Sequence, residues 1–192
     1  MLAILFIVIL ILTSILFNIF VKKFKIKKVY HIISIILPSI CLLYTEWYVV
    51  EFLLFLIIFE ILTILSFVDI KYLEIDGNSY FFILIPSIIQ FLFFSESYFL
   101  GILSVLLVYL TFWIFDKMVG IEQLGGADVK IILILSLYFS ASDIFSFIIY
   151  SFGISLLIFL ILALKNRTFK GIEVPMIVAI NISFFIQKAF LI

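Results

Sequence analysis

Long uninterrupted runs of apolar residues constrain the fold of this sequence more than any other feature. They are too long and too numerous for a signal peptide followed by a soluble domain. Of the 192 residues, 67% are hydrophobic and only 12% are charged, whereas a soluble domain is about half apolar and about a quarter charged. The surface of a soluble core must stay polar. These proportions argue against a soluble enzyme, a disordered chain and a nucleic-acid binder.

We predict an all-α polytopic membrane protein with about eight transmembrane helices, which form a single integral-membrane domain over residues 1–192. A helix that crosses the roughly 30 Å hydrocarbon core of a bilayer needs about 20 residues. The alternating pattern typical of a membrane barrel does not occur in the sequence. The predicted spans are residues 1–21, 29–44, 47–68, 79–94, 98–115, 129–139, 144–164 and 174–190. Several of these spans are short, and 129–139 is the shortest.

The basic residues predict how these spans are oriented. The first span has no positive segment before it and no small-residue cleavage site, and it is followed at once by the lysine-rich residues 22–28. This order is typical of an uncleaved anchor with its N-terminus outside. When the remaining loops alternate, eleven of the twelve Lys and Arg residues fall on the cytoplasmic side, and only Lys188 falls outside. Such an excess of positive charge is typical of cytoplasmic loops.

Two acidic segments lie on the predicted cytoplasmic side. Asp69 closes the third span, where it either marks the membrane boundary or has a catalytic role. Asp128 follows Gly125, Gly126 and Ala127 at the start of the sixth span. The helix dipole favours a carboxylate at that position, so Asp128 is either an ordinary capping residue or a catalytic one. The two glycines allow the backbone to bend and to approach other groups closely.

The predicted topology brings Asp69 and Asp128 to the same face of the membrane. Two carboxylates that lie close together can share a proton, because they cannot both ionise readily. The ionised one can activate water as a base, while the protonated one hydrogen-bonds the scissile carbonyl. This is the chemistry of an aspartic peptidase, and it requires neither a metal nor a cofactor.

At these residues the chain resembles the type IV prepilin peptidases, the GxGD-type intramembrane aspartic peptidases that include the archaeal preflagellin peptidases. In that family a first catalytic Asp precedes a loop of the form Asp-x-x-x-x-x-Ile-Pro-Asp/Asn. Here Asp69 precedes Ile75 at the matching spacing, with Asp76 in the Pro position. The second catalytic Asp of the family lies in Gly-x-Gly-Asp or a close variant, as in residues 125–130 (Gly-Gly-Ala-Asp-Val-Lys). A Pro-containing segment opens the last helix of the family, and residues 174–176 (Val-Pro-Met) are similar.

The resemblance implies a membrane aspartic endopeptidase with Asp69 and Asp128 as its catalytic pair. Its substrate would be a prepilin, pseudopilin or archaellin precursor, cut between a short basic leader and the following helix at the cytoplasmic face of the cell membrane. Members that also methylate the product carry an extra cytoplasmic segment with paired CxxC motifs. In this sequence the loop after the first span is short and Cys41 is the one cysteine. We therefore expect peptidase activity alone, with no zinc and no methyl donor.

Other charged residues near the two motifs have more than one interpretation. Lys71 and Lys130 each lie two residues beyond a proposed catalytic Asp, and each either supports that residue or anchors its helix at the cytoplasmic face. Glu74, Asp76 and Glu122 either attract the basic leader, since a low dielectric near the membrane strengthens such attraction, or are solvated loop charges.

A rival interpretation is a small transporter or membrane assembly subunit whose acidic residues bind ions or partners. It would account for Glu60, an acidic residue inside the third span, about 180° around the helix from Asp69. It does not account for the spacing of the two motifs.

Overall fold

The computed structural model describes residues 49–72, 79–94, 98–119, 126–139, 141–168 and 172–190. The helices in these residues are α3 (Val49–Tyr72), α4 (Phe81–Phe94), α5 (Tyr98–Val119), α6 (Gly126–Tyr138), α7 (Ala141–Asn166) and α8 (Met176–Phe190). The described part of the chain contains no strand, so the all-α prediction is confirmed there. The first two predicted spans, the lysine-rich segment and Cys41 lie outside the described residues.

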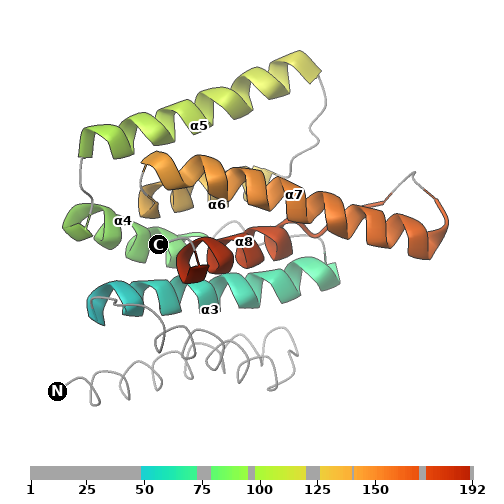
Figure 1. Cartoon of the computed structure of the whole chain (residues 1–192), viewed down its shortest axis with the longest axis horizontal. Helices are drawn as coiled ribbons and strands as arrows, with labels where there is room; N and C mark the ends of the chain where they lie inside the picture. Colours follow the sequence, from blue (N-terminus) through green and yellow to red (C-terminus); the bar gives the residue numbers. More distant parts are fainter. Residues whose placement is uncertain are drawn as a thin grey trace.

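Consecutive helices run in opposite directions (Figure 1). In that view α3, α5 and α7 run from left to right, and α4, α6 and α8 run back. Helix α8 packs against both α3 and α7, α4 packs against both α3 and α6, and α5 lies at the edge of the bundle against α6 and α7. The alternation brings the end of α3 and the beginnings of α6 and α8 to one end of the bundle.

Two of the described helices, α3 and α7, are long and apolar enough to cross a membrane, over Val50–Tyr72 and Asp143–Asn166. Helix α3 is mostly buried inside the bundle, whereas α7 turns large apolar side chains outward, among them Ile149, Ile161 and Leu164. An extended exposed apolar surface of this kind marks a face that contacts lipid or another protein. The apolar stretches of α4, α5 and α8 are shorter.

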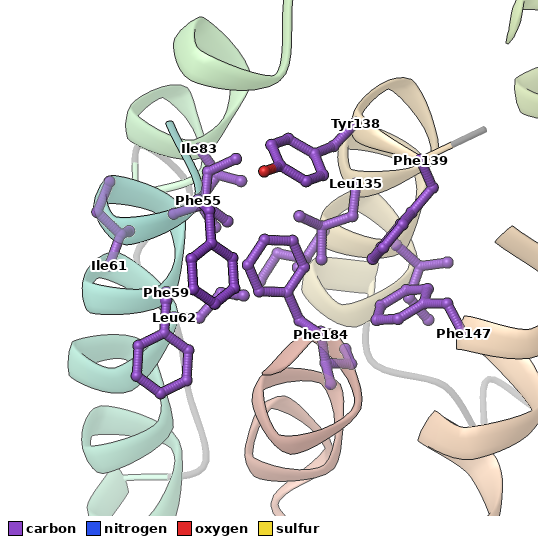
Figure 2. Packing of buried hydrophobic residues seen from close by; sticks show 14 of the residues in the cluster. Phe55, Phe59, Ile61, Leu62, Ile83, Leu135, Tyr138, Phe139, Phe147 and Phe184 are labelled. Atoms are coloured by element: carbon purple, nitrogen blue, oxygen red, sulfur yellow. The ribbon is translucent and has the colours of Figure 1, made fainter. Parts of the chain in front are cut away.

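A cluster of aromatic rings joins α3, α6, α7 and α8 (Figure 2). Phe184 of α8 is fully buried, and its ring centre lies 5.5 Å from that of Phe55 on α3 and 5.2 Å from that of Tyr138 on α6. Phe139, directly after α6, lies 5.6 Å from Phe184 and 4.8 Å from Phe147 of α7. Rings at these separations are in contact. The cluster therefore fixes the relative positions of the helices that carry the two acidic residues.

The helix bounds differ from the predicted spans by no more than four residues. The largest differences include the end of α3, which continues past the apolar run to Tyr72. Asp69 therefore lies in the last turn of a helix and not at the start of a loop. Helix α6 begins at Gly126, earlier than predicted, and Asp128 lies in its first turn as expected.

Candidate active site

Asp69 connects the end of α3 to the start of α8. Its side chain is buried, with 7% of the residue surface exposed, and its Oδ2 accepts a hydrogen bond of 3.0 Å from the backbone N–H of Ile177. Ile177 is the second residue of α8, which begins directly after Pro175. The first N–H groups of a helix have no partner within it, and the helix dipole favours a negative charge there. Asp69 thus caps α8 from a neighbouring helix.

Further polar contacts join α3 to α8 near Asp69. The Ser66 hydroxyl donates to the Leu62 carbonyl oxygen of its own helix at 2.7 Å and also lies 3.3 Å from the carbonyl oxygen of Ile177. The Asn181 side-chain amide donates to the Thr63 hydroxyl at 3.1 Å. The sequence motifs did not point to Ser66, Thr63 or Asn181. The available signal was their polar character inside predicted apolar spans.

The first turns of α6 are tied to α4. Asp128 is half-buried in the first turn of α6, as is Ala127. A Cβ atom built at Gly126 would meet no described atom within 4 Å beyond its chain neighbours and its own helix backbone. Lys130 donates to the Tyr80 hydroxyl at 3.4 Å, and its Nζ lies 5.1 Å from the centre of the Tyr80 ring. Tyr80 directly precedes α4, so Lys130 connects the starts of two helices.

Asp69 and Asp128 lie at the same end of the bundle, on helices that are not direct backbone neighbours (Figure 1). Among the described residues, no Cα atom of α3 lies within 8 Å of one in α6, so the Cα atoms of these two residues are more than 8 Å apart. Helices α4 and α8 each pack against both α3 and α6. Each acidic segment is therefore held by a different neighbour, Asp69 by α8 and the Asp128 turn by α4 through Lys130.

Of the remaining predicted site residues, the structure describes Lys71. Lys71 is exposed, and its Nζ lies 4.8 Å from the centre of the adjacent Tyr72 ring, beyond the buried part of α3. Four residues lie outside the described part of the chain: Glu74, Asp76, Glu122 and Gly125. The described residues contain no group of three or more His, Cys, Asp and Glu side chains that could hold a metal ion.

Basic side chains gather at the end of the bundle that holds Asp69. They lie in or just after the last turns of α3, α5 and α7 and near the start of α6. They are Lys71, Lys117, Lys130, Lys165 and Arg167. Lys188 lies at the opposite end, in the last turn of α8. The predicted topology likewise separates Lys188 from the other basic residues. The Lys188 side chain, however, is buried.

Apolar helices with acidic and basic side chains gathered at one end are features of a helical, membrane-associated protein. A match to a family model identifies the kind of membrane-associated protein. The model of the type IV leader peptidase family matches residues 54–164, which include both Asp69 and Asp128. The match covers more than half of the 192 residues, and the chain belongs to this family.

Membership of the family confirms the resemblance seen in the motifs. It makes the chain a protease of the prepilin peptidase type, which processes prepilin-type substrates. The matched region ends before Pro175, so the contact of Asp69 with the start of α8 reaches beyond it. No curated protein and no solved structure matches the chain.

Proposed function

We propose that the chain is a multi-pass membrane aspartic endopeptidase that removes the short basic leader from prepilin-like precursors at the cytoplasmic face of the cell membrane. Asp69 and Asp128 are its catalytic pair. The observation that carries this proposal is that both carboxylates belong to the region matched by the family and lie at one end of the bundle. Prepilin, pseudopilin and archaellin precursors all have the required form, a basic leader before an apolar helix.

The proposed topology has eight spans with the N-terminus outside. The alternation of α3 to α8 supports it, and so does the gathering of basic side chains at the end that holds Asp69 (Figure 1). Positive residues near span ends favour the cytoplasmic side. This orientation puts the carboxylates beside the leader of a substrate whose own helix crosses the membrane.

The proposed reaction begins when substrate binding draws the two acidic segments together, because catalytic contacts often tighten only in the bound state. One carboxylate of the Asp69–Asp128 pair takes a proton from water, and the resulting nucleophile attacks the scissile carbonyl carbon. The other, protonated carboxyl hydrogen-bonds the carbonyl oxygen. Breakdown of the tetrahedral intermediate breaks the C–N bond and delivers a proton to the leaving amine.

The other predicted site residues have supporting roles in this proposal. Glu74, Asp76 and Glu122 attract the positive leader. Gly125 and Gly126 shape the approach to Asp128. Lys130 holds this segment against α4 through Tyr80, and Lys71 anchors the end of α3.

The test uses a model substrate with a basic leader and the purified protein in detergent or nanodiscs. Asp69→Asn and Asp128→Asn are each expected to reduce cleavage at least about 100-fold, the scale of losing an acid or base group. Glu173→Gln is the control, because Glu173 is an exposed acidic residue before α8 and lies outside the region that the family model matches. Cleavage at the unmodified rate by either of the first two variants would contradict the peptidase mechanism and favour a transport or assembly role.

A further inference from the structure

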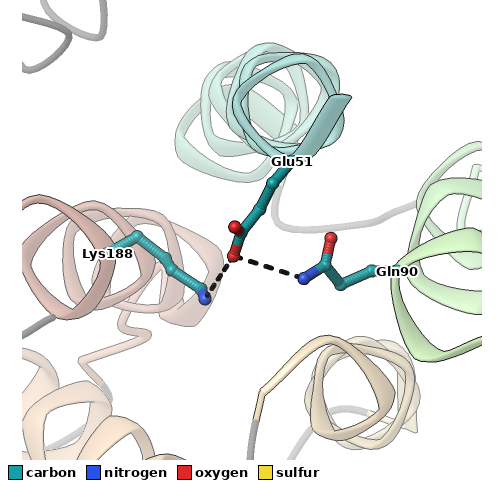
Figure 3. A network of polar contacts seen from close by, with 3 residues as sticks. All are labelled: Glu51, Gln90 and Lys188. Atoms are coloured by element: carbon teal, nitrogen blue, oxygen red, sulfur yellow. Dashed lines mark hydrogen bonds and ion pairs between the residues drawn. The ribbon is translucent and has the colours of Figure 1, made fainter. Parts of the chain in front are cut away.

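A polar cluster of buried Lys188, buried Gln90 and half-buried Glu51 (Figure 3) lies at the end of the bundle away from Asp69. Lys188 of α8 is 6% exposed, and its Nζ lies 3.8 Å from Oε1 of Glu51, in the first turn of α3. The side-chain amide of Gln90 on α4 donates to the same oxygen at 3.4 Å. The Lys188 ammonium also lies 4.9 Å from the ring centre of Tyr138 and 5.7 Å from that of Phe139. One lysine thus contacts side chains of α3 and α6, and shares Glu51 with α4.

A buried charge in apolar surroundings is costly unless it is paired, and removing one partner of a buried pair is strongly destabilising. The pairing of Lys188 with Glu51 therefore favours a single alignment of α8 along α3. A shift of α8 by one residue moves its side chains about 1.5 Å along the axis and about 100° around it. Lys188 would then point away from Glu51.

The cluster and the contact at Asp69 lie on matching faces of the same two helices. Glu51 and Asp69 are separated by about five helical turns, so they lie on one side of α3, roughly 27 Å apart along its axis. Ile177 and Lys188 are separated by about three turns, so they lie on one side of α8. The contact between Thr63 and Asn181 joins the two helices between these ends. The alignment that brings Lys188 to Glu51 is the one that brings the Ile177 N–H to Asp69.

We infer that Lys188, Glu51 and Gln90 form a register lock, which aligns α8 on α3 so that the start of α8 holds the Asp69 carboxylate in place. Lys188 and Glu51 are then positioning residues that act on the site through the length of α8. The inference rests on the proposed function for its effect on catalysis. Its structural part, the coupling of Lys188 to the contact between Ile177 and Asp69, can be measured without any substrate.

The experiment compares Lys188→Met and Glu51→Gln with Lys188→Arg, which keeps a positive charge beside Glu51 and the two rings. Lys165→Met is the control, because Lys165 is an exposed lysine in the last turn of another helix. The first readout is hydrogen exchange of the Ile177 amide, which Asp69 protects. We expect faster exchange at Ile177 in Lys188→Met and Glu51→Gln, unchanged exchange in the control and retained protection in Lys188→Arg.

The second readout is cleavage of the model substrate. Loss of the lock should lower kcat about tenfold, since small misplacements of catalytic groups have effects of this size. KM should change less than about twofold, because substrate binding does not use the lock. The Lys188→Arg variant should keep much of kcat.

The outcomes separate the inference from the proposed function. If the unmodified protein does not cleave the substrate, the proposed function fails and the exchange data still decide whether the lock exists. If a folded Lys188→Met or Glu51→Gln variant protects Ile177 as well as the unmodified protein does, the lock is wrong. If Lys188→Met and Glu51→Gln do not fold, Lys188→Arg decides: it must fold and protect Ile177, and failure to do so overturns the inference.

Discussion

The Asp69 carboxylate and the Ile177 backbone N–H form a hydrogen bond of 3.0 Å between residues 108 positions apart. Asp69 therefore has a structural role in addition to the catalytic one proposed for it, because it caps α8. The start of α8 cannot move away from α3 without breaking this bond. Any movement that brings Asp69 towards Asp128 must either carry the start of α8 along or release it.

The cap predicts that two substitutions of Asp69 have different effects on stability. Asn retains an oxygen that accepts the Ile177 N–H, whereas Ala does not. Asp69→Ala should lower the free energy of unfolding by about 1 kcal/mol, the usual cost of losing a helix cap, and Asp69→Asn by clearly less. Both should abolish cleavage. Denaturation in detergent checks the difference, and equal destabilisation by the two variants would show that the cap does not contribute.

Replacing Gly126 by Ala is predicted to lower activity without lowering stability. Beyond the chain neighbours and the backbone of its own helix, no described atom lies within 4 Å of a methyl group built there, and Ala favours a helix over Gly by up to about 1 kcal/mol. Gly126→Ala should therefore be at least as stable as the unmodified protein. If the open space beside Asp128 receives the substrate backbone, cleavage should fall about tenfold, as expected for a misplaced reacting group.

Gly153 provides the matched control for this substitution. It lies in α7, and a Cβ there also meets no described atom within 4 Å beyond its chain neighbours and its own helix backbone. Gly153→Ala should therefore leave cleavage unchanged. Full activity of Gly126→Ala would show that the glycine is not needed for substrate approach.

Two substitutions of Tyr80 are predicted to differ in how strongly they disturb the position of the segment that carries Asp128. Tyr80→Phe removes the hydroxyl that Lys130 contacts but keeps the ring beneath its ammonium, and Tyr80→Leu removes both. A cation–π contact contributes about 0.5–1 kcal/mol at an exposed site, so Tyr80→Leu should lower kcat about three- to fivefold and Tyr80→Phe less. Tyr109→Leu, at an exposed tyrosine on α5, is the control. Equal rates for all four proteins would mean that Lys130 does not position Asp128.

The aromatic cluster predicts a large effect on stability at Phe184. This residue is 0% exposed and its ring lies among those of Phe55, Tyr138 and Phe139 (Figure 2), whereas Phe93 on α4 is 76% exposed. Phe184→Ala should lower the free energy of unfolding by about 3 kcal/mol or more, the usual effect of truncating a buried Phe. Phe93→Ala should change it by less than about 0.5 kcal/mol. Similar losses at the two positions would contradict the packing described above.

Electrostatic recognition of the leader predicts an effect of charge reversal. Replacing Glu74, Asp76 and Glu122 together by Lys should raise KM for a basic-leader substrate and lower it for one with an acidic leader. The effect should weaken with added salt, because exposed charges are screened beyond about 8 Å at physiological ionic strength. Steady-state kinetics at two salt concentrations measures this. Unchanged KM for both substrates would leave these residues as ordinary loop charges.

The apolar runs and the residues around Asp128 predicted much of the structure of the described residues. The apolar runs predicted six helices to within four residues of their ends, and Asp128 lies in the first turn of α6 as predicted. The contact of Asp69 with Ile177 and the burial of Lys188 were not predicted. Both depend on how α8 aligns with α3, and the spacing of apolar residues within one helix carries no information about its register against another.

Three helices around the acidic residues are short. Helices α4, α6 and α8 have 14, 13 and 15 residues, which is about 20–22 Å at 1.5 Å per residue. The hydrocarbon layer of a bilayer is about 30 Å thick, and a mismatch of this size is relieved by local thinning of the bilayer or by burying helix ends among neighbouring helices. In a membrane the lipid surface would therefore dip towards the ends of these helices. Hydrolysis consumes water, and such a depression would let the aqueous phase reach carboxylates that lie below the level of the surrounding headgroups.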